Sequence, residues 1–395
     1  MSLISMERHL WLCSLTIVVL FCCLACADKQ DYLVTIDTEK KYPTLDLKVS
    51  DLAEIRYVKL GGVEEGIFVN GGSSSQICID ESRGLIIIGE TTKRVHVSVF
   101  DTEGHFLRSI GREGRGPGEF IDIFNLVYDS ENDIINIFCP HKIIRYTSRG
   151  NYLGEVSRSG LHVFGLYFVQ DSSIVYFNDH STYIDINGKK RENGRTLTMF
   201  DKRSLEDIPL EDHHYSKIWE SGKYKDFPYG NTLYPSGNVC YTDSGYLITS
   251  SRSDTTYLFN RNRQMIPFML DVRHNAEREY LLTPTVDSKE YLFVILSARN
   301  GEWPMGNRYY AIRKHDKKVF SCGESYFYRF AYREKFYFGN GACVQNPGYV
   351  ISFIHRYDLD EAKNKGQEFP KEVQLLSEGL TEDSNPILML AKFKI

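Results

Sequence analysis

The chain lacks several features that would point to particular classes of function. It has no basic excess, since 47 Lys and Arg stand against 52 Asp and Glu and leave a net charge of −5, so nucleic acid is not an expected partner. After residue 26 it contains no HExxH, GxSxG or CxxC motif, which are the local patterns of zinc peptidases, serine hydrolases, and redox or zinc-binding proteins. Local motifs therefore predict no catalytic residue, no metal ligand and no cofactor.

Cysteine is scarce in the main body of the chain. Four of the nine cysteines fall in the first 26 residues, and the other five are isolated: Cys78, Cys139, Cys240, Cys322 and Cys343. This spacing excludes a dense disulfide framework and predicts small buried hydrophobic residues in strands, although a single disulfide stays open in an oxidising compartment.

The only long uncharged apolar run lies at the beginning, from Leu10 to Ala25. Sixteen such residues are short for a hydrocarbon core about 30 Å thick and match the central region of a secretory signal peptide. The start codon is either Met1 or Met6. We predict a signal peptide over residues 1–25.

The residues that end this run, Cys23-Leu24-Ala25-Cys26, resemble the lipobox of bacterial lipoproteins, with Leu one place later than usual. The resemblance implies a diacylglyceryl group on Cys26, and two acyl chains suffice for stable membrane anchoring. It places the protein in the bacterial cell envelope, at the outer membrane or its periplasmic face, with the membrane as a partner. Residues 26–44 would then be a tether. An ordinary signal peptide and an uncleaved N-terminal anchor are the alternatives to lipidation.

Short β-type segments separated by turn residues fill the chain from Gln76 onward, about one every ten positions. An aromatic residue followed by a polar turn and another apolar segment recurs at Phe100, Tyr146, Phe200 and Phe259, at spacings of 46, 54 and 59 residues. Units of four strands with this period are typical of β-propeller blades. We predict an all-β fold over residues 45–395, a single propeller of six or seven four-stranded antiparallel blades; a β-sandwich pair is the alternative.

Both ends of the chain carry strand-like segments, within residues 45–60 and 387–395. Segments such as Leu85–Glu90 are apolar on both faces, so each sheet needs a neighbour on each side, which a closed ring provides. We predict that the N- and C-terminal strands meet in one blade and close the ring.

A glycine-rich segment follows the first clear blade, in the order Phe100-Asp101, Gly104, Phe106-Leu107, Ile110-Gly111 and then Gly116-Pro117-Gly118-Glu119-Phe120. With the Asn385-Pro386-Ile387 ending, this pattern resembles the six-bladed β-propeller lipoproteins of Bacteroidetes, relatives of NHL-type propellers. The resemblance favours six blades and implies no particular reaction.

The same glycines have an alternative interpretation as a phosphate-binding loop. Gly111 and Gly116 have the right spacing, but Pro117 stands where such a loop needs lysine, and a strand rather than a helix follows. We expect the glycines to permit a blade-to-blade crossing. Arg112 and Arg115 would present positive charge at a ring face, offset by Glu113 and Glu119.

Two long insertions are the best candidates for ligand binding, because long loops often carry function. One spans residues 211–235 and contains Trp219, Tyr224 and Tyr229; the other, residues 299–308, contains Trp303. Aromatic side chains beside polar ones suit a sugar ring or a peptide. They could equally form a local core.

Three functions stay open on the sequence alone. The first is an envelope-anchored propeller that binds a glycan, a peptide or a partner protein and is not an enzyme. The second is a propeller enzyme of the lactonase or lyase type with a divalent cation in the central channel, and the third is a structural subunit of an envelope complex.

Overall fold

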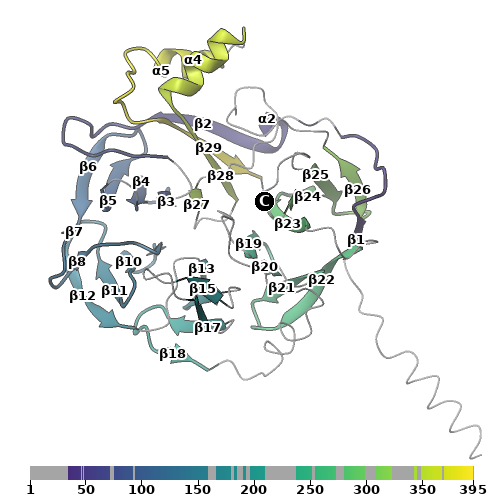
Figure 1. Cartoon of the computed structure of the whole chain (residues 1–395), viewed down its shortest axis with the longest axis horizontal. Coiled ribbons are helices and arrows are strands. Elements are labelled where there is room, and N and C mark those ends of the chain that lie inside the picture. Colours follow the sequence, from purple (N-terminus) through teal and green to yellow (C-terminus); the bar gives the residue numbers. More distant parts are fainter. Residues whose placement is uncertain are drawn as a thin grey trace, which may run out of the picture.

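The computed structural model describes the chain in a set of ranges with gaps between them. The described residues are 34–45, 47, 49–71, 75–91, 94–158, 166–178, 182–184, 190–192, 196–209, 237–250, 254–272, 280–298, 308–322, 342–344, 348–366 and 369–394. Within them, six small sheets stand around a common centre like the blades of a propeller (Figure 1). The predicted all-β propeller is confirmed, with six blades.

Five blades are four-stranded meanders that run from the centre outwards. Blade 1 contains β3 (Ser75–Asp80), β4 (Leu85–Glu90), β5 (His96–Asp101) and β6 (Phe106–Ile110). Blade 2 contains β9 (Asn125–Asp129), β10 (Ile134–Phe138), β11 (Lys142–Tyr146) and β12 (Tyr152–Ser157). Blade 3 contains β13 (Leu166–Gln170), β14 (Ser173–Asn178), β17 (Thr196–Asp201) and β18 (Asp207–Ile208).

The next two blades follow the same order. Blade 4 contains β19 (Gly237–Thr242), β20 (Gly245–Ser250), β21 (Thr255–Asn260) and β22 (Met265–Val272). Blade 5 contains β23 (Tyr280–Asp287), β24 (Tyr291–Ala298), β25 (Arg308–Arg313) and β26 (Lys318–Ser321). Three small additions are the pairs β7 (Arg112–Glu113) with β8 (Glu119–Phe120) and β15 (Thr182–Ile184) with β16 (Lys190–Glu192), and β27 (Ala342–Val344), which pairs in parallel with β3.

Blade 6 closes the ring with strands from both ends of the chain. Its order is β28 (Tyr349–Ile354), β29 (Ile387–Phe393) and β2 (Ala53–Lys59), which follows the short helix α2 (Val49–Leu52). The antiparallel register runs from Ala53 opposite Phe393 to Lys59 opposite Ile387. The predicted meeting of N- and C-terminal strands in one blade is therefore confirmed.

The tether predicted over residues 26–44 requires a correction. Val34–Asp37 form β1, which pairs in parallel with β22 as a fifth strand on the outer edge of blade 4. Val34 and Ile36 are buried in the core between blades 4 and 5. This part of the chain is an ordered strand because its alternating apolar residues fill that core.

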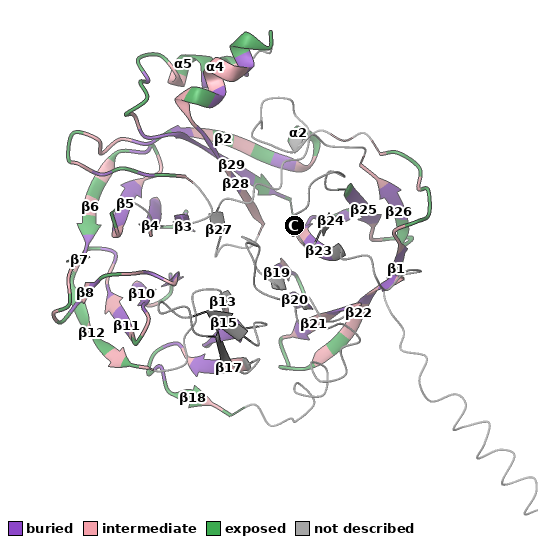
Figure 2. Cartoon of the chain, viewed as in Figure 1, coloured by how far each residue is buried: buried purple, intermediate pink, exposed green. Residues whose placement is uncertain are grey.

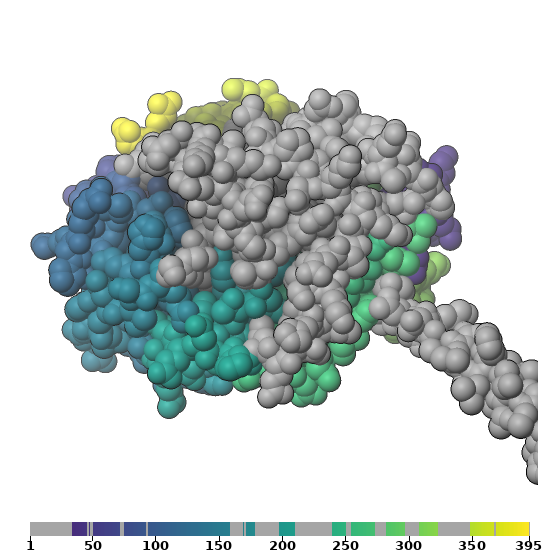
Figure 3. Space-filling model, turned by 60° about the horizontal axis from the view of Figure 1, so that its bottom comes forward, coloured from purple at the N-terminus to yellow at the C-terminus, as the bar shows by residue number. Residues whose placement is uncertain are grey.

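Apolar cores lie between successive blades all around the ring, as the buried strands in Figure 2 show. All six residues of β4 are buried; Leu85 and Ile87 lie in the core with blade 2, and Ile86 and Ile88 lie in the core with blade 6. The aromatic residues that marked the repeat, Phe100, Tyr146, Phe200 and Phe259, are all buried. Each lies in the third strand of its blade and packs against the preceding blade. In a space-filling view, blades 1 to 4 follow one another around one side of the ring (Figure 3).

Four of the isolated cysteines are free thiols, and Cys78, Cys139 and Cys240 are buried, as predicted for small apolar residues. The helices α4 (Arg356–Asn364) and α5 (Lys371–Leu376) were not predicted. They stand between β28 and β29, outside the ring, over a small core that includes Ala362 and Val373.

Candidate functional site

The two faces of the ring differ in the length of the connections that they carry. Strand direction alternates within each blade, so the first-to-second and third-to-fourth connections lie on one face, and the other connections lie on the opposite face. On the first face, which we call the tight-turn face, the connections of blades 1 to 5 contain two to five residues. The connection of blade 6 that holds α4 and α5 lies on the opposite face, because the other end of its strands, at Tyr349 and Lys392, contacts the first-to-second turn of blade 1.

The opposite face, which we call the long-connection face, carries the longest connections between successive propeller strands of blades 3 to 5. There, 28 residues separate β18 from β19, 20 separate β26 from β27, 17 separate β14 from β17 (with the β15–β16 pair among them), and 9 separate β24 from β25. This face also holds the strand ends that flank the two predicted insertions, which are Ile208, Gly237, Ala298 and Arg308. Trp219, Tyr224, Tyr229 and Trp303 themselves lie outside the described residues, as does Cys26.

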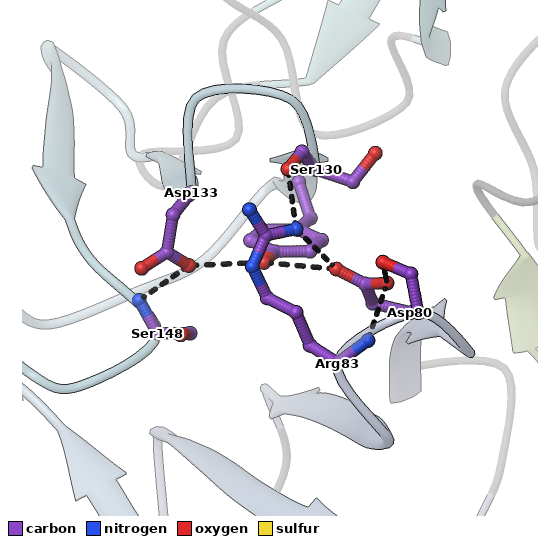
Figure 4. Close-up of polar contacts among 7 residues, drawn as sticks. Asp80, Arg83, Ser130, Asp133 and Ser148 are labelled. Atoms are coloured by element: carbon purple, nitrogen blue, oxygen red, sulfur yellow. Dashed lines mark hydrogen bonds and ion pairs between the residues drawn. The ribbon is translucent and has the colours of Figure 1, made fainter.

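Polar networks join neighbouring blades on the tight-turn face. Figure 4 shows one between blades 1 and 2, where the Arg83 guanidinium donates to Asp80 Oδ2 over 2.8 Å and to the Ser130 carbonyl. The Tyr128 hydroxyl donates to Asp133 Oδ1 over 2.9 Å and lies 3.2 Å from Asp80 Oδ2. Hydrogen bonds from these donors hold the pKa of Asp80 below its usual value even though burial opposes them.

The same arrangement recurs at other blade junctions. Lys202, which is buried, lies 3.3 Å from Asp129 Oδ1 and 2.6 Å from Glu131 Oε2 between blades 2 and 3. Glu81 accepts from Tyr349 and Lys392 where blade 6 meets blade 1. Because these charges are paired with one another across the junctions, they act as clamps between blades.

Arg112 and Arg115 lie in the glycine-rich connection between blades 1 and 2, on the long-connection face. Both are exposed, but Arg112 Nε donates to Glu119 Oε1 over 2.6 Å. Glu119 also accepts from the Gly116 N–H over 2.8 Å, and these donors lower its pKa. The predicted offset by Glu119 is confirmed for Arg112, so Arg115 is the guanidinium of this loop without a described ion pair.

The loop folds back on blade 2 instead of opening into a phosphate cradle. Gly118 has φ +73° and passes so close to blade 2 that its carbonyl accepts from the Tyr146 hydroxyl over 2.6 Å. The Gly118 N–H donates to Glu155 Oε2 over 3.0 Å, and Lys142 donates to the same oxygen over 2.9 Å. This geometry agrees with the blade-to-blade crossing expected from the glycines.

Glu90 is a buried acid at the long-connection end of blade 1 that the sequence did not single out. It is fully buried and lies opposite Ser75 in the strand register. Its Oε1 accepts from the Ser75 hydroxyl over 2.5 Å and from the Asn70 N–H over 3.1 Å, whereas its Oε2 has no hydrogen-bond partner among the described residues. Burial raises the pKa of Glu90 by more than the hydrogen bonds from these donors lower it. A glutamate after an apolar run was the only sequence signal.

Replacing Glu90 with glutamine is expected to stabilise the protein at neutral pH. A folded-state pKa above the unfolded value means that stability falls as pH rises from the unfolded pKa, near 4.3, through the folded pKa, and then levels off. Glu90→Gln keeps an acceptor for Ser75 and Asn70 but removes the charge, so the decline should flatten. Urea unfolding at a series of pH values between 4.5 and 8 measures this pH dependence of stability. Glu54→Gln, at an exposed position of β2, is the control and should leave the profile unchanged. An unchanged pH profile in Glu90→Gln would contradict this assignment.

Two further observations concern metals and membranes. Among the residues with described positions, no three His, Cys, Asp or Glu side chains are grouped so that they could hold a metal ion. Within the same residues, no helix has both the length and the apolar character to cross a bilayer.

The fold defines this protein as a six-bladed β-propeller with its long connections gathered on one face. The chain belongs to the family described as "Domain of unknown function (DUF4934)", which matches residues 33–392. No curated protein matches it.

Two of the similar solved structures come from Bacteroides. A crystal structure described as a "putative exported protein" from Bacteroides fragilis is similar with a TM-score of 0.61 and 15% identity, covering 92% of this chain and all of the other. A member of the DUF4221 family from Bacteroides vulgatus has a TM-score of 0.46 and 12% identity, over 87% of this chain and 97% of the other. The first supports the six-bladed fold; the NHL-type relationship stays a prediction.

Proposed function

We propose that this protein is an envelope-anchored propeller that binds a glycan, a peptide or a partner protein on its long-connection face. The observation that carries the proposal is the segregation of connections, with turns of two to five residues on one face of blades 1 to 5 and connections of up to 28 residues on the other. Binding residues in rigid scaffolds concentrate on long loops that the scaffold positions. The name of the Bacteroides fragilis neighbour supports export.

The lipid anchor is the second part of this proposal. Cys26 ends an apolar leader and follows a small residue, and the described propeller begins eight residues later at Val34. Cys26→Ser should release the protein from the membrane fraction of the host cell. Membrane association that persists in this variant would contradict lipidation.

The binding prediction can be measured with the soluble fragment that begins at Ala27. Trp219→Ala and Trp303→Ala are each expected to weaken binding about tenfold or more, since aromatic contacts commonly dominate such sites. Glycan arrays and a pull-down from envelope membranes identify the ligand, and titration calorimetry then measures its affinity. Tyr357→Ala is the matched control, because Tyr357 is an exposed aromatic residue of α4 in the insertion of blade 6. Equal affinities for all three variants would exclude the two insertions as the site.

A further inference from the structure

The direction of β1 shows from which side the chain reaches the propeller. β1 runs parallel to β22, with Val34 opposite Met269 and Asp37 opposite Val272. β22 begins after the third-to-fourth turn of blade 4, so it runs from the tight-turn face towards the long-connection face. The N-terminal end of β1 therefore points towards the tight-turn face, along the outer edge of blade 4.

Chain length limits how far the propeller can lie from a lipid on Cys26. Cys26 precedes Val34 by eight residues, which span at most about 28 Å when fully extended. An eight-residue strand such as β22 is about 27 Å long, so this reach is close to the height of one blade. The outer edge of blade 4 must then stay near the bilayer surface.

The turn tips beside this edge carry exposed positive charge. The third-to-fourth turn of blade 4 presents Arg261 and Arg263, and the corresponding turn of blade 5 presents Lys317 and Lys318. Arg263 has φ +62° and Lys317 has φ +57°, so both occupy the same left-handed position of the turn. The acid of the blade 5 turn, Asp316, is already paired with Arg313 over 2.7 Å.

Negative charge gathers on a different part of the ring. The helical insertion of blade 6 exposes several acids near α5: Glu372, Glu378, Glu382 and Asp383. Blade 6 is separated from blade 4 by blade 5. The exposed charge around the ring is therefore uneven, with cations at the tips beside β1 and acids at the insertion.

We propose that the tight-turn tips of blades 4 and 5 face the membrane and contact anionic phospholipid headgroups. Basic side chains next to a lipid anchor are attracted to an anionic leaflet and add to its hold. This orientation leaves the long-connection face directed away from the bilayer, where a glycan or protein can reach it. The inference rests on the lipid anchor at Cys26 of the proposed function and adds the orientation.

Fluorescence quenching by the bilayer tests the orientation in the full-length acylated protein. A fluorophore is attached at one introduced cysteine, Asn262→Cys at the blade 4 tip, Glu103→Cys at the equivalent turn of blade 1, or Glu113→Cys on the long-connection face, all three exposed positions. Vesicles of phosphatidylcholine and phosphatidylglycerol carry lipids brominated near the headgroup. We expect quenching at least threefold stronger at position 262 than at 113, with 103 between them. Stronger quenching at 113 than at 262 would overturn the proposal.

Charge reversal provides an independent measurement on the non-acylated fragment. Arg261→Glu with Arg263→Glu should reduce sedimentation with phosphatidylglycerol vesicles at low salt by about fivefold or more. Arg94→Glu with Arg115→Glu makes the same charge change at exposed sites on the long-connection face and should have little effect. Equal effects of the two pairs would count against a specific membrane-facing surface.

The outcomes separate this inference from the proposed function. Ligand binding by the Trp219 and Trp303 variants tests the proposed ligand site. Its result does not depend on how the propeller is oriented on the membrane. If Cys26→Ser leaves membrane association intact, the anchor fails. If the anchor holds but the quenching order is reversed, only the orientation fails.

Discussion

Replacing Asn385 with alanine is expected to lower the free energy of unfolding by about 3 to 5 kcal/mol, since three backbone groups, two of them in buried hydrogen bonds, lose their partner. Asn385 is buried, and its Nδ2 donates to the Gly61 carbonyl over 2.6 Å and to the Ile67 carbonyl over 2.9 Å. Its Oδ1 accepts from the Val69 N–H over 2.8 Å. One side chain therefore fixes the segment that leads from β2 of blade 6 to β3 of blade 1.

Equilibrium urea unfolding, followed by aromatic fluorescence, measures this loss. Asn385→Asp should be destabilising as well, because it keeps the acceptor for Val69 but places a second carboxylate oxygen against two carbonyls. Asn151→Ala, at an exposed position in the third-to-fourth turn of blade 2, is the control and should change stability by less than about 0.5 kcal/mol. A loss below about 1 kcal/mol for Asn385→Ala would contradict its role in closing the ring.

The repeat of the fold could be predicted because it is local. An aromatic residue followed by a polar residue marks the end of the third strand, and in the structure the polar side chain stabilises the turn that follows. In four blades this polar side chain accepts a hydrogen bond from a backbone N–H of the following turn; these residues are Asp101, Thr147, Asp201 and Asn260. The turn residues and the alternation of apolar and polar side chains lie within about a dozen residues of one another. A short stretch of sequence is therefore enough to predict the strands and turns of a blade.

The contacts between blades could not be predicted, since their partners are far apart in the sequence. Asn385 and Val69 are 316 residues apart, and Lys392 and Glu81 are 311 apart. No period or motif relates such pairs. The Asn385-Pro386-Ile387 ending is part of the pattern that resembles the Bacteroidetes propellers. The structure gives its physical role, because Asn385 lies at the ring closure.

Two elements were missed for different physical reasons. β1 is short and lies among polar residues, and it is a strand because it pairs with β22 of blade 4 and buries Val34 and Ile36 against blade 5. The helices α4 and α5 bury few residues, among them Ala362 and Val373, so their apolar pattern is weak. The candidate site was predicted only in outline: the strand ends around both insertions share a face with Arg112 and Arg115, whereas Glu90 gave no distinctive signal.

Replacing Gly104 with alanine is expected to lower the free energy of unfolding by about 2 to 4 kcal/mol, from left-handed backbone strain and a steric clash together. Gly104 has φ +89°, and a Cβ added there would lie 2.3 Å from the Lys59 carbonyl oxygen and 2.7 Å from Val58 Cγ1. Lys59 ends β2, the outer strand of blade 6, and the Gly61 N–H donates to the Gly104 carbonyl over 2.9 Å. The turn of blade 1 is thus pressed against the strand that closes the ring.

Left-handed backbone alone does not require glycine at this turn position. In blades 3, 4 and 5 it is occupied by Leu205, Arg263 and Lys317, with φ between +57° and +62°. Gly66→Ala is therefore the matched control, because Gly66 has φ +76° and no atom within 4 Å of an added Cβ. Urea unfolding should show a loss of about 1 kcal/mol for Gly66→Ala, and the excess at Gly104 then measures the contact with β2. Equal losses at the two glycines would mean that β2 moves aside freely, and that the close approach of blades 6 and 1 does not constrain the ring.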